Sequence, residues 1–471
     1  MASRFLDGAQ SKRVLALATP VIFAMLTQTT VNIVDTYFLK KLPCADASDA
    51  QAALTPALML LWAVGGFLSS VSVGTLAIAA RRFGEERHEA AGAVVLNAVL
   101  IALVGGTVAG IAGWIAMPRM FAAIVSSPHV AHLGTLYTRW RFLAIVPMAA
   151  TAAYKAFFDG IGKTHFHLWA AVAMNIVNVA LCWLLIFGHW GFPRMGIEGA
   201  GIAAGASSWI GMLVMIGFSL RGKFRSKFRF YRPGNVSGRL VWDILKLSVP
   251  GGLATVAVMS GFLLFTKIVA RLDAGAVQMV VQHASECGGV RVAVNGAATT
   301  IIIEVLSATF VSCLAFGTAT ATLVGQSLGQ GQPALAQSYA WTSVKLGIFI
   351  FGGLGGLIYW QAPAVMGVFS DAPAVIAAGV PPLRLVSAGG WMLAIGMILM
   401  QALFGAGDTR YVLMVELGLH FGCLVPLAWV FGMIMNWGLI GVWSSAGVYV
   451  AFLAVFMAVR FQLGGWKHLK V

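Results

Sequence analysis

The sequence predicts an all-α polytopic membrane protein with about twelve transmembrane helices in two pseudo-symmetric six-helix bundles. Three observations predict this class. Hydrophobic residues make up 59% of the 471 residues, charged residues make up 10%, and the mean hydropathy is +0.87; this composition excludes an ordinary soluble enzyme. Apolar runs long enough to cross a bilayer recur along the whole chain. The two halves of the chain also repeat each other.

The apolar runs predict the helices and their orientation. A polar, basic stretch precedes the first run, which is too long for a signal-peptide core, so we expect an uncleaved first helix. The expected spans are 14–39, 53–79, 91–117, 136–158, 165–187, 197–220, 243–271, 298–324, 338–362, 380–404, 411–434 and 438–460. Of the 31 Lys and Arg residues, 21 fall on the side of the termini. The positive-inside rule therefore places both termini in the cytoplasm, in a plasma membrane that we take to be a bacterial inner membrane.

Two offsets relate the halves of the chain. Leu17 and Pro20 recur 230 residues later, as Leu247 and Pro250. Further along, FFDGIGKT at 157–164 aligns with ALFGAGDT at 402–409, and ARRFG at 80–84 aligns with GQSLG at 325–329, both at an offset of 245. The change of offset predicts an insertion on the outer side. Because each repeat has an even number of crossings, the halves share one orientation and a substrate path should run between them.

The predicted organisation follows from the repeat. It is an N-lobe at 1–220, a basic cytoplasmic linker at 221–242, and a C-lobe at 243–471 with the outward insertion at about 273–296. In the linker, RGKFRSKFRFYR at 221–232 alternates cations with aromatic residues. Nucleic acid could bind such a pattern, but we expect the linker to lie on anionic membrane lipids with its aromatic side chains at the interface. We expect no nucleic-acid partner, and we expect a monomer.

The first predicted helix carries a carboxylate, Asp35, deep in its apolar run. An Asp at mid-bilayer costs roughly 2.5–3.5 kcal/mol on insertion scales, so it usually faces a protein interior or a watery cavity. Gln28, Asn32 and Asp35 follow helical spacings and share one side of the helix. We expect this side to line a polar cavity. The alternative is an Asp that is paired for packing alone.

Several motifs in order resemble the multidrug and toxic compound extrusion (MATE) transporters across nearly the whole chain. They are PVIFAMLTQTTVNIVDTYFLKKL, GTLAIAARRFGEER, FDGIGKT, NIVNVALCWLLIFG, GIEGAGIA, ATATLVGQSLGQG and FGAGDTR. The resemblance implies two six-helix lobes in a V shape and transport by alternating access. It also implies export of amphipathic, often cationic drugs or metabolites, driven by inward H⁺ or Na⁺, and small-molecule substrates as the main partners.

The resemblance also indicates a coupling-ion site. Asp35 stands where the family keeps a carboxylate in its first helix, and Asn178 matches an asparagine in the fifth helix, with Asn175 nearby. Where the family often places a second carboxylate, this chain has Cys182, and a thiol is a poor ligand for a hard cation. We therefore expect H⁺ coupling in preference to Na⁺, with no cofactor and no bound metal.

Two further pairs of ionisable residues leave their roles open. Glu304 and Lys267 are expected at similar depths near the outer side, where they either form an ion pair or line the cavity, with Glu304 as a second protonation or cation-binding site. Glu416 and His420 lie four residues apart on one helix face. They either relay protons or form a polar contact between helices.

Two other functions stay open as alternatives to the exporter. A lipid-linked glycan flippase of the same superfamily would need a cationic cavity and usually carries additional helices. An intramembrane enzyme is the weakest alternative, because the sequence contains no HExxH, no GxSxG and no cluster of metal-ligand residues. We therefore expect a transporter and not an enzyme.

Overall fold

The computed structural model describes residues 7–40, 44–125, 127–275, 279–284 and 288–469, and it is helical over almost this whole range. Side chains are not described for residues 28–37, 39–40, 44–52, 55, 124 and 275–292. The first half of the chain contains α1 (Gly8–Lys40), α2 (Cys44–Ser69), α3 (Val71–Gly84), α4 (His88–Ile124), α5 (Pro128–Leu143), α6 (Ile145–Gly160), α7 (His165–Phe187) and α8 (Gly196–Leu220).

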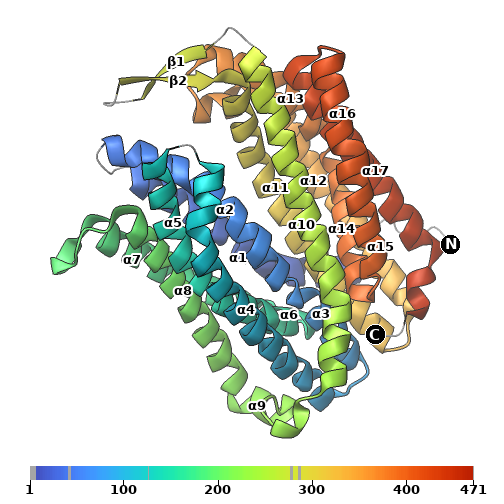
Figure 1. Ribbon diagram of the computed structural model, residues 1–471. Helices are drawn as coiled ribbons and strands as arrows, with labels where there is room; N and C mark the ends of the chain where they lie inside the picture. The colour runs from blue at the N-terminus through green and yellow to red at the C-terminus, as the bar shows by residue number, and fades with distance from the viewer. Residues whose placement is uncertain (1–6, 41–43, 126, 276–278, 285–287, 470–471) are drawn as a thin grey trace.

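The second half has the same general plan. After the linker helix α9 (Gly222–Phe228) it contains α10 (Gly238–Gly275), β1 (Met279–Ala284), β2 (Gly288–Ala293), α11 (Val294–Gly329), α12 (Pro333–Phe369), α13 (Pro373–Ala388), α14 (Gly390–Ala406), α15 (Thr409–Leu419), α16 (Val425–Trp429) and α17 (Gly438–Leu463). Two π-helical turns, His420–Leu424 and Val430–Ile434, flank α16. Figure 1 shows the linker at one end of the molecule and the strands at the other, which we call the linker end and the hairpin end.

The helices are long enough to cross a membrane. Among the described residues, nine helical stretches are long and apolar enough, and two bent pairs raise this number to eleven. The bends are 45° between α5 and α6 and 53° between α13 and α14, and they fall at Ala144 and Gly389, which are equivalent at the offset of 245. The predicted fold class is therefore confirmed.

Helix α1 belongs to both bundles. Near its start, Val14 and Ala18 are fully buried in a core cluster that otherwise consists of residues from the second half, such as Phe316 and Leu323. Near its end, Phe38 packs into the core of the first half, with its ring centroid 5.8 Å from that of Phe187. Helix α1 thus begins against one bundle and ends inside the other.

Helix α10 repeats this crossing in the opposite sense. Near the linker end, Leu240 and Ile244 pack against Val71 and Val94 of the first half. Towards the hairpin end, Phe265 joins the core of the second half, and its ring lies 5.1 Å from Trp443. The two crossing helices are the first helices of the two repeats, so the structure has the internal symmetry that the sequence offsets predict.

The linker packs differently from the expectation. Phe228 and Phe230 are 1% exposed and lie in an aromatic core with Phe157 and Phe158 of α6. Their ring centroids lie 5.1 and 5.2 Å from that of Phe157. The prediction that the aromatic side chains lie at the lipid interface is wrong for these two residues, because the linker end of the first bundle offers them an apolar pocket. The basic side chains stay outside, and Arg229 pairs with Glu89 at 2.8 Å.

The expected insertion contains an antiparallel hairpin. Strands β1 and β2 pair from Met279 with Ala293 to Ala284 with Gly288, and the hairpin projects at the end opposite the linker (Figure 1). At its base, both carboxylate oxygens of Asp273 accept backbone N–H groups at the start of α11, from Asn295 at 2.9 Å and Gly296 at 2.8 Å. Asp273 therefore ties the end of α10 to the beginning of α11.

Candidate functional site between the two bundles

The bundles meet closely at the linker end, where α3 crosses α11. A Cβ atom added to Gly84 would overlap the carbonyl oxygen of Gln326, and one added to Gly329 would overlap the carbonyl oxygen of Arg81. Gly84 and Gly329 are equivalent at the offset of 245, and so are Arg81 and Gln326. The contact is therefore reciprocal, as at a two-fold axis, and only glycine allows this approach of two backbones.

Hydrogen bonds reinforce the same junction, which we call the gate. Gln326 donates from Nε2 to the carbonyl oxygen of Gly160 at 2.8 Å, and Thr322 donates to the carbonyl oxygen of Asp159 at 3.1 Å. Arg81 donates to the carbonyl oxygen of Leu469 at 2.7 Å, which joins the chain's last helical turn to the first bundle. These bonds link segments that are 163–388 residues apart in sequence, so they hold the bundles together at this end.

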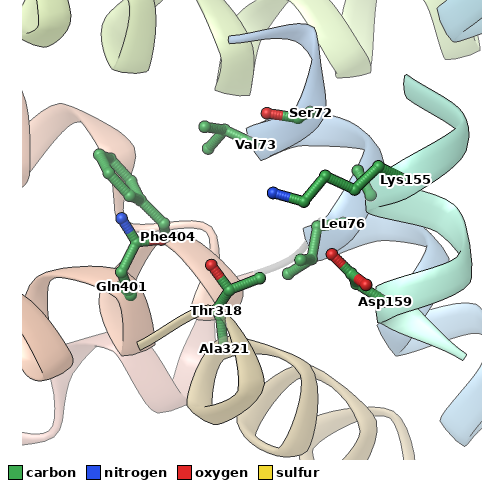
Figure 2. Close-up of a pocket in the computed structure, with 10 residues that line it drawn as sticks. Ser72, Val73, Leu76, Lys155, Asp159, Thr318, Ala321, Gln401 and Phe404 are labelled. Carbon is green, nitrogen blue, oxygen red and sulfur yellow. The ribbon is translucent and has the colours of Figure 1, made fainter. Parts of the chain in front are cut away.

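A small cavity of about 60 Å³ lies directly above the gate, between α3 and α6 of the first bundle and α11 and α14 of the second (Figure 2). Five polar side chains face it, namely Ser72, Lys155, Asp159, Thr318 and Gln401. Polar groups that converge on a cavity between two lobes are the usual sign of a binding site.

Asp159 is the unusual member of this group. It is 0% exposed, and within the described part of the chain neither of its carboxylate oxygens accepts a hydrogen bond. Lys155, one turn earlier on α6, extends its ammonium group into the same cavity (Figure 2), but the described ion pairs do not include Lys155 with Asp159. A buried carboxylate without a partner is costly, so the cavity is suited to a ligand that supplies hydrogen-bond donors.

The repeat makes the polarity of this cavity asymmetric. At the offset of 245, Lys155 corresponds to Met400 and Asp159 to Phe404. The other polar residues of the cavity also have apolar or small residues at their equivalent positions. These are Gly317 for Ser72, Val73 for Thr318 and Ala156 for Gln401. Sequence reasoning passed over Lys155 and Asp159, although the alignment of FFDGIGKT with ALFGAGDT contains the contrast between Asp159 and Phe404.

The expected coupling site lies on α1 and α7, which pack against each other. The side chains of Asp35, Gln28 and Asn32 lie outside the described residues. On α7, Asn178 is 2% exposed, and the Cys182 thiol lies 3.9 Å from its Oδ1. The amide nitrogen of Asn178 has no hydrogen-bond partner among the described residues.

Asn175 shares this property. Both polar atoms of its side chain are buried without a hydrogen-bond partner in the described part of the chain. Two neighbouring asparagines on α7 thus keep unused hydrogen-bonding groups.

Glu304 lies on α11 and Lys267 on α10. Both side chains are exposed, and the ion pairs among described residues do not include the two together. The described structure thus contains no ion pair between these two exposed side chains. The role of Glu304 as a second protonation or cation-binding site stays a prediction.

Glu416 and His420 do face each other. The Nδ1 atom of His420 lies 3.1 Å from Oε2 of Glu416, and Tyr449 of α17 donates to the same oxygen at 3.0 Å. Both residues are at most 2% exposed. Gly261 of α10 lies against the imidazole, where a Cβ would come within 2.5 Å of Cδ2. The cluster joins α10, α15 and α17, and this geometry fits a polar contact between helices.

Two bundles related by an internal two-fold axis, with polar groups enclosed between them, are the architecture of membrane transporters built from repeats. The MatE family profile matches residues 20–184 and 287–430. The chain belongs to the MatE family, and the family prediction is confirmed.

Named multidrug resistance proteins resemble the chain over nearly its full length. It is 26% identical over 458 residues to the probable multidrug resistance protein NorM of Rhizobium meliloti (strain 1021), covering 95% of this chain and 92% of that protein. It is 24% identical over 480 residues to the multidrug resistance protein PmpM of Pseudomonas aeruginosa, covering 98% and 93%.

Solved structures share the fold. An outward-facing multidrug resistance MATE family transporter of the MOP superfamily matches with a TM-score of 0.85 at 18% identity, covering 97% of each chain. A MOP superfamily transporter from Pyrococcus furiosus Vc1, described with a binding pocket of reverse polarity, matches with a TM-score of 0.83 at 18% identity, covering 96% of this chain and 95% of that one.

Proposed function

We propose that this protein is a secondary active antiporter of the bacterial inner membrane that exports small amphipathic, often cationic drugs or metabolites. Inward movement of H⁺, in preference to Na⁺, drives export by alternating access. The names of the related NorM and PmpM proteins support multidrug extrusion as the activity. In this proposal both termini and the linker face the cytoplasm, in agreement with the distribution of Lys and Arg.

The observation that carries the proposal is the gate. The two bundles are joined at the linker end through a reciprocal glycine contact between α3 and α11. A contact made by two small, equivalent surfaces can separate without unfolding either bundle. Helices α1 and α10 each pack in both bundles. They therefore keep the two bundles connected when the bundles tilt relative to each other. We take the structure as the state with the cytoplasmic gate closed, and opening of this gate gives the second state that alternating access requires.

Proton coupling is assigned to Asp35, with Asn175 and Asn178 as its neighbours on α7. The amide nitrogens of both asparagines have no hydrogen-bond partner among the described residues and are available to a carboxylate from α1. Hydrogen bonds from amides stabilise the charged carboxylate, whereas burial favours the neutral one, so the site can change its protonation state as access alternates. Cys182, which is fully buried beside Asn178, offers a soft sulfur where Na⁺ would need oxygen ligands.

Ion substitution in proteoliposomes tests this function. The purified protein is reconstituted, and movement of the cationic dye ethidium is followed while a pH gradient and a Na⁺ gradient are imposed separately. We expect the pH gradient to drive the dye uphill in exchange for H⁺, and the Na⁺ gradient at constant pH to have no effect above protein-free liposomes. Uphill transport under the Na⁺ gradient alone would contradict H⁺ coupling, and no response to either gradient would contradict antiport.

A further inference from the structure

The cavity above the gate holds two opposite charges that form no ion pair within the described residues. The carboxylate of Asp159 is fully buried and accepts no hydrogen bond from the described residues. The ammonium group of Lys155 enters the same space (Figure 2). A cationic ligand would satisfy Asp159 and meet repulsion from Lys155, and an anionic ligand would do the reverse. A ligand that carries both charges satisfies both side chains and leaves no buried charge uncompensated.

The size of the cavity agrees with this chemistry. One water-sized group needs roughly 10–15 Å³ of such space, so a cavity of about 60 Å³ accepts about four to six such groups. This is the size of an ammonium group and a carboxylate joined through a single carbon atom. The amide of Gln401 and the hydroxyls of Ser72 and Thr318 also face the cavity and can complete the hydrogen bonds of such a head group.

We propose that this cavity is a subsite for the charged head group of a zwitterionic substrate, with Lys155 receiving the carboxylate and Asp159 receiving the ammonium group. The proposal rests on the transport function proposed above and extends it to amino acids and other compact zwitterions. The apolar part of such a substrate lies outside the subsite, between the bundles.

The position of the two charges fits a transport cycle. Lys155 and Asp159 both lie on α6, so they stay together when the bundles separate. Thr318 and Gln401 come from the second bundle, so they complete the subsite only while the gate is closed. An open gate exposes the charged pair towards the linker side, and closure then surrounds the head group. The apolar equivalents Met400 and Phe404 mean that the repeat supplies only one such subsite.

Three related probes test the proposal with the full-length protein in nanodiscs. They are phenylalanine, its methyl ester, which lacks the carboxylate charge, and N-acetylphenylalanine, which lacks the ammonium charge. We expect the wild type to bind phenylalanine at least tenfold more tightly than either derivative, because each derivative loses a charge-assisted contact. Equal affinity for the three probes, or no binding of phenylalanine, would overturn the proposal.

Variants assign each charge to its partner. Asp159→Asn keeps the shape and should abolish the preference over N-acetylphenylalanine while a preference over the methyl ester remains. Lys155→Met introduces the side chain of the equivalent position 400 and should abolish the preference over the methyl ester alone. Lys163→Met removes an exposed lysine outside the cavity and serves as the matched control, with affinities like the wild type. Variants that weaken all three probes equally would indicate a structural or proton-exchange role and would overturn the assignment.

The ethidium assay separates this inference from the proposed function. If the wild type pumps ethidium and shows no preference for phenylalanine, the zwitterion subsite is rejected and the exporter stands. If ethidium is not pumped, the exporter is rejected, and the binding comparison still decides whether the cavity recognises a zwitterion.

Discussion

Adding a single methyl group at the gate should shift the protein towards the state with the linker end open. In Gly84→Ala, the new Cβ overlaps the carbonyl oxygen of Gln326, and in Gly329→Ala it overlaps that of Arg81. Backbone atoms cannot rotate away as the end of a side chain can, so the bundles themselves must separate. The reciprocal geometry predicts effects of similar size for the two variants.

The size of the effect follows from the cost of overpacking. An additional methyl group in a closely packed contact costs about 1–3 kcal/mol, and each 1.4 kcal/mol changes an equilibrium tenfold. The closed gate should therefore lose between roughly fivefold and 150-fold in population relative to the open one. Each bundle keeps its own core, so global stability should change much less than the position of this equilibrium.

Electron paramagnetic resonance measures the opening directly. Spin labels are attached through Lys223→Cys beside the first bundle and Gln332→Cys in the second, both exposed near the linker end, in a background without the native cysteines. We expect longer distances to become more populated in both variants. Gly217→Ala is the matched control, because a Cβ at this helical position meets no atom within 4 Å. Unchanged distances in both gate variants would refute the reciprocal contact as the closing element.

Two further variants test other described contacts. Glu416→Leu removes the acceptor for the Tyr449 hydroxyl, which should cost about 1–3 kcal/mol, whereas Nδ1 of His420 keeps the backbone carbonyl oxygen of residue 416 at 2.9 Å. We expect a lower midpoint of thermal unfolding for Glu416→Leu, and normal driven transport for Glu416→Gln; loss of driven transport in Glu416→Gln would favour the proton relay. Asn97→Ala removes the amide that donates to the carbonyl oxygen of Asn235 at 2.8 Å and should make the linker more sensitive to limited proteolysis, and equal cleavage rates would contradict this anchoring.

The sequence was sufficient for the fold because its signals are local or periodic. Hydropathy located the spans, and the offset of 245 paired α3 with α11 and α6 with α14. The β hairpin was not predicted, although the alternation in VVQHA and VRVAV is typical of strands. The stretch lies between two long apolar helices, whose hydropathy signal is much stronger than this short alternation.

The candidate site was harder to predict because its burial comes from distant segments. Lys155 and Asp159 lie near the end of a predicted helix, where an acidic and a basic residue four positions apart usually face solvent. The second bundle, through Thr322 and Gln326, helps to cover this end of α6, and the order of residues in the sequence does not show this contact. The aromatic residues of the linker are a similar case. Their spacing in the sequence does not show that Phe157 and Phe158 form a pocket for them.

The most direct test of the central claim is driven transport by Asp35→Asn in proteoliposomes. The asparagine has nearly the shape of the protonated carboxyl group but cannot release a proton. The account predicts a normally folded protein that binds ethidium and does not move it uphill under an imposed pH gradient, whereas the wild type does. Uphill transport by Asp35→Asn at the wild-type rate would contradict the account and place proton coupling elsewhere, with Glu304 as the next residue to replace.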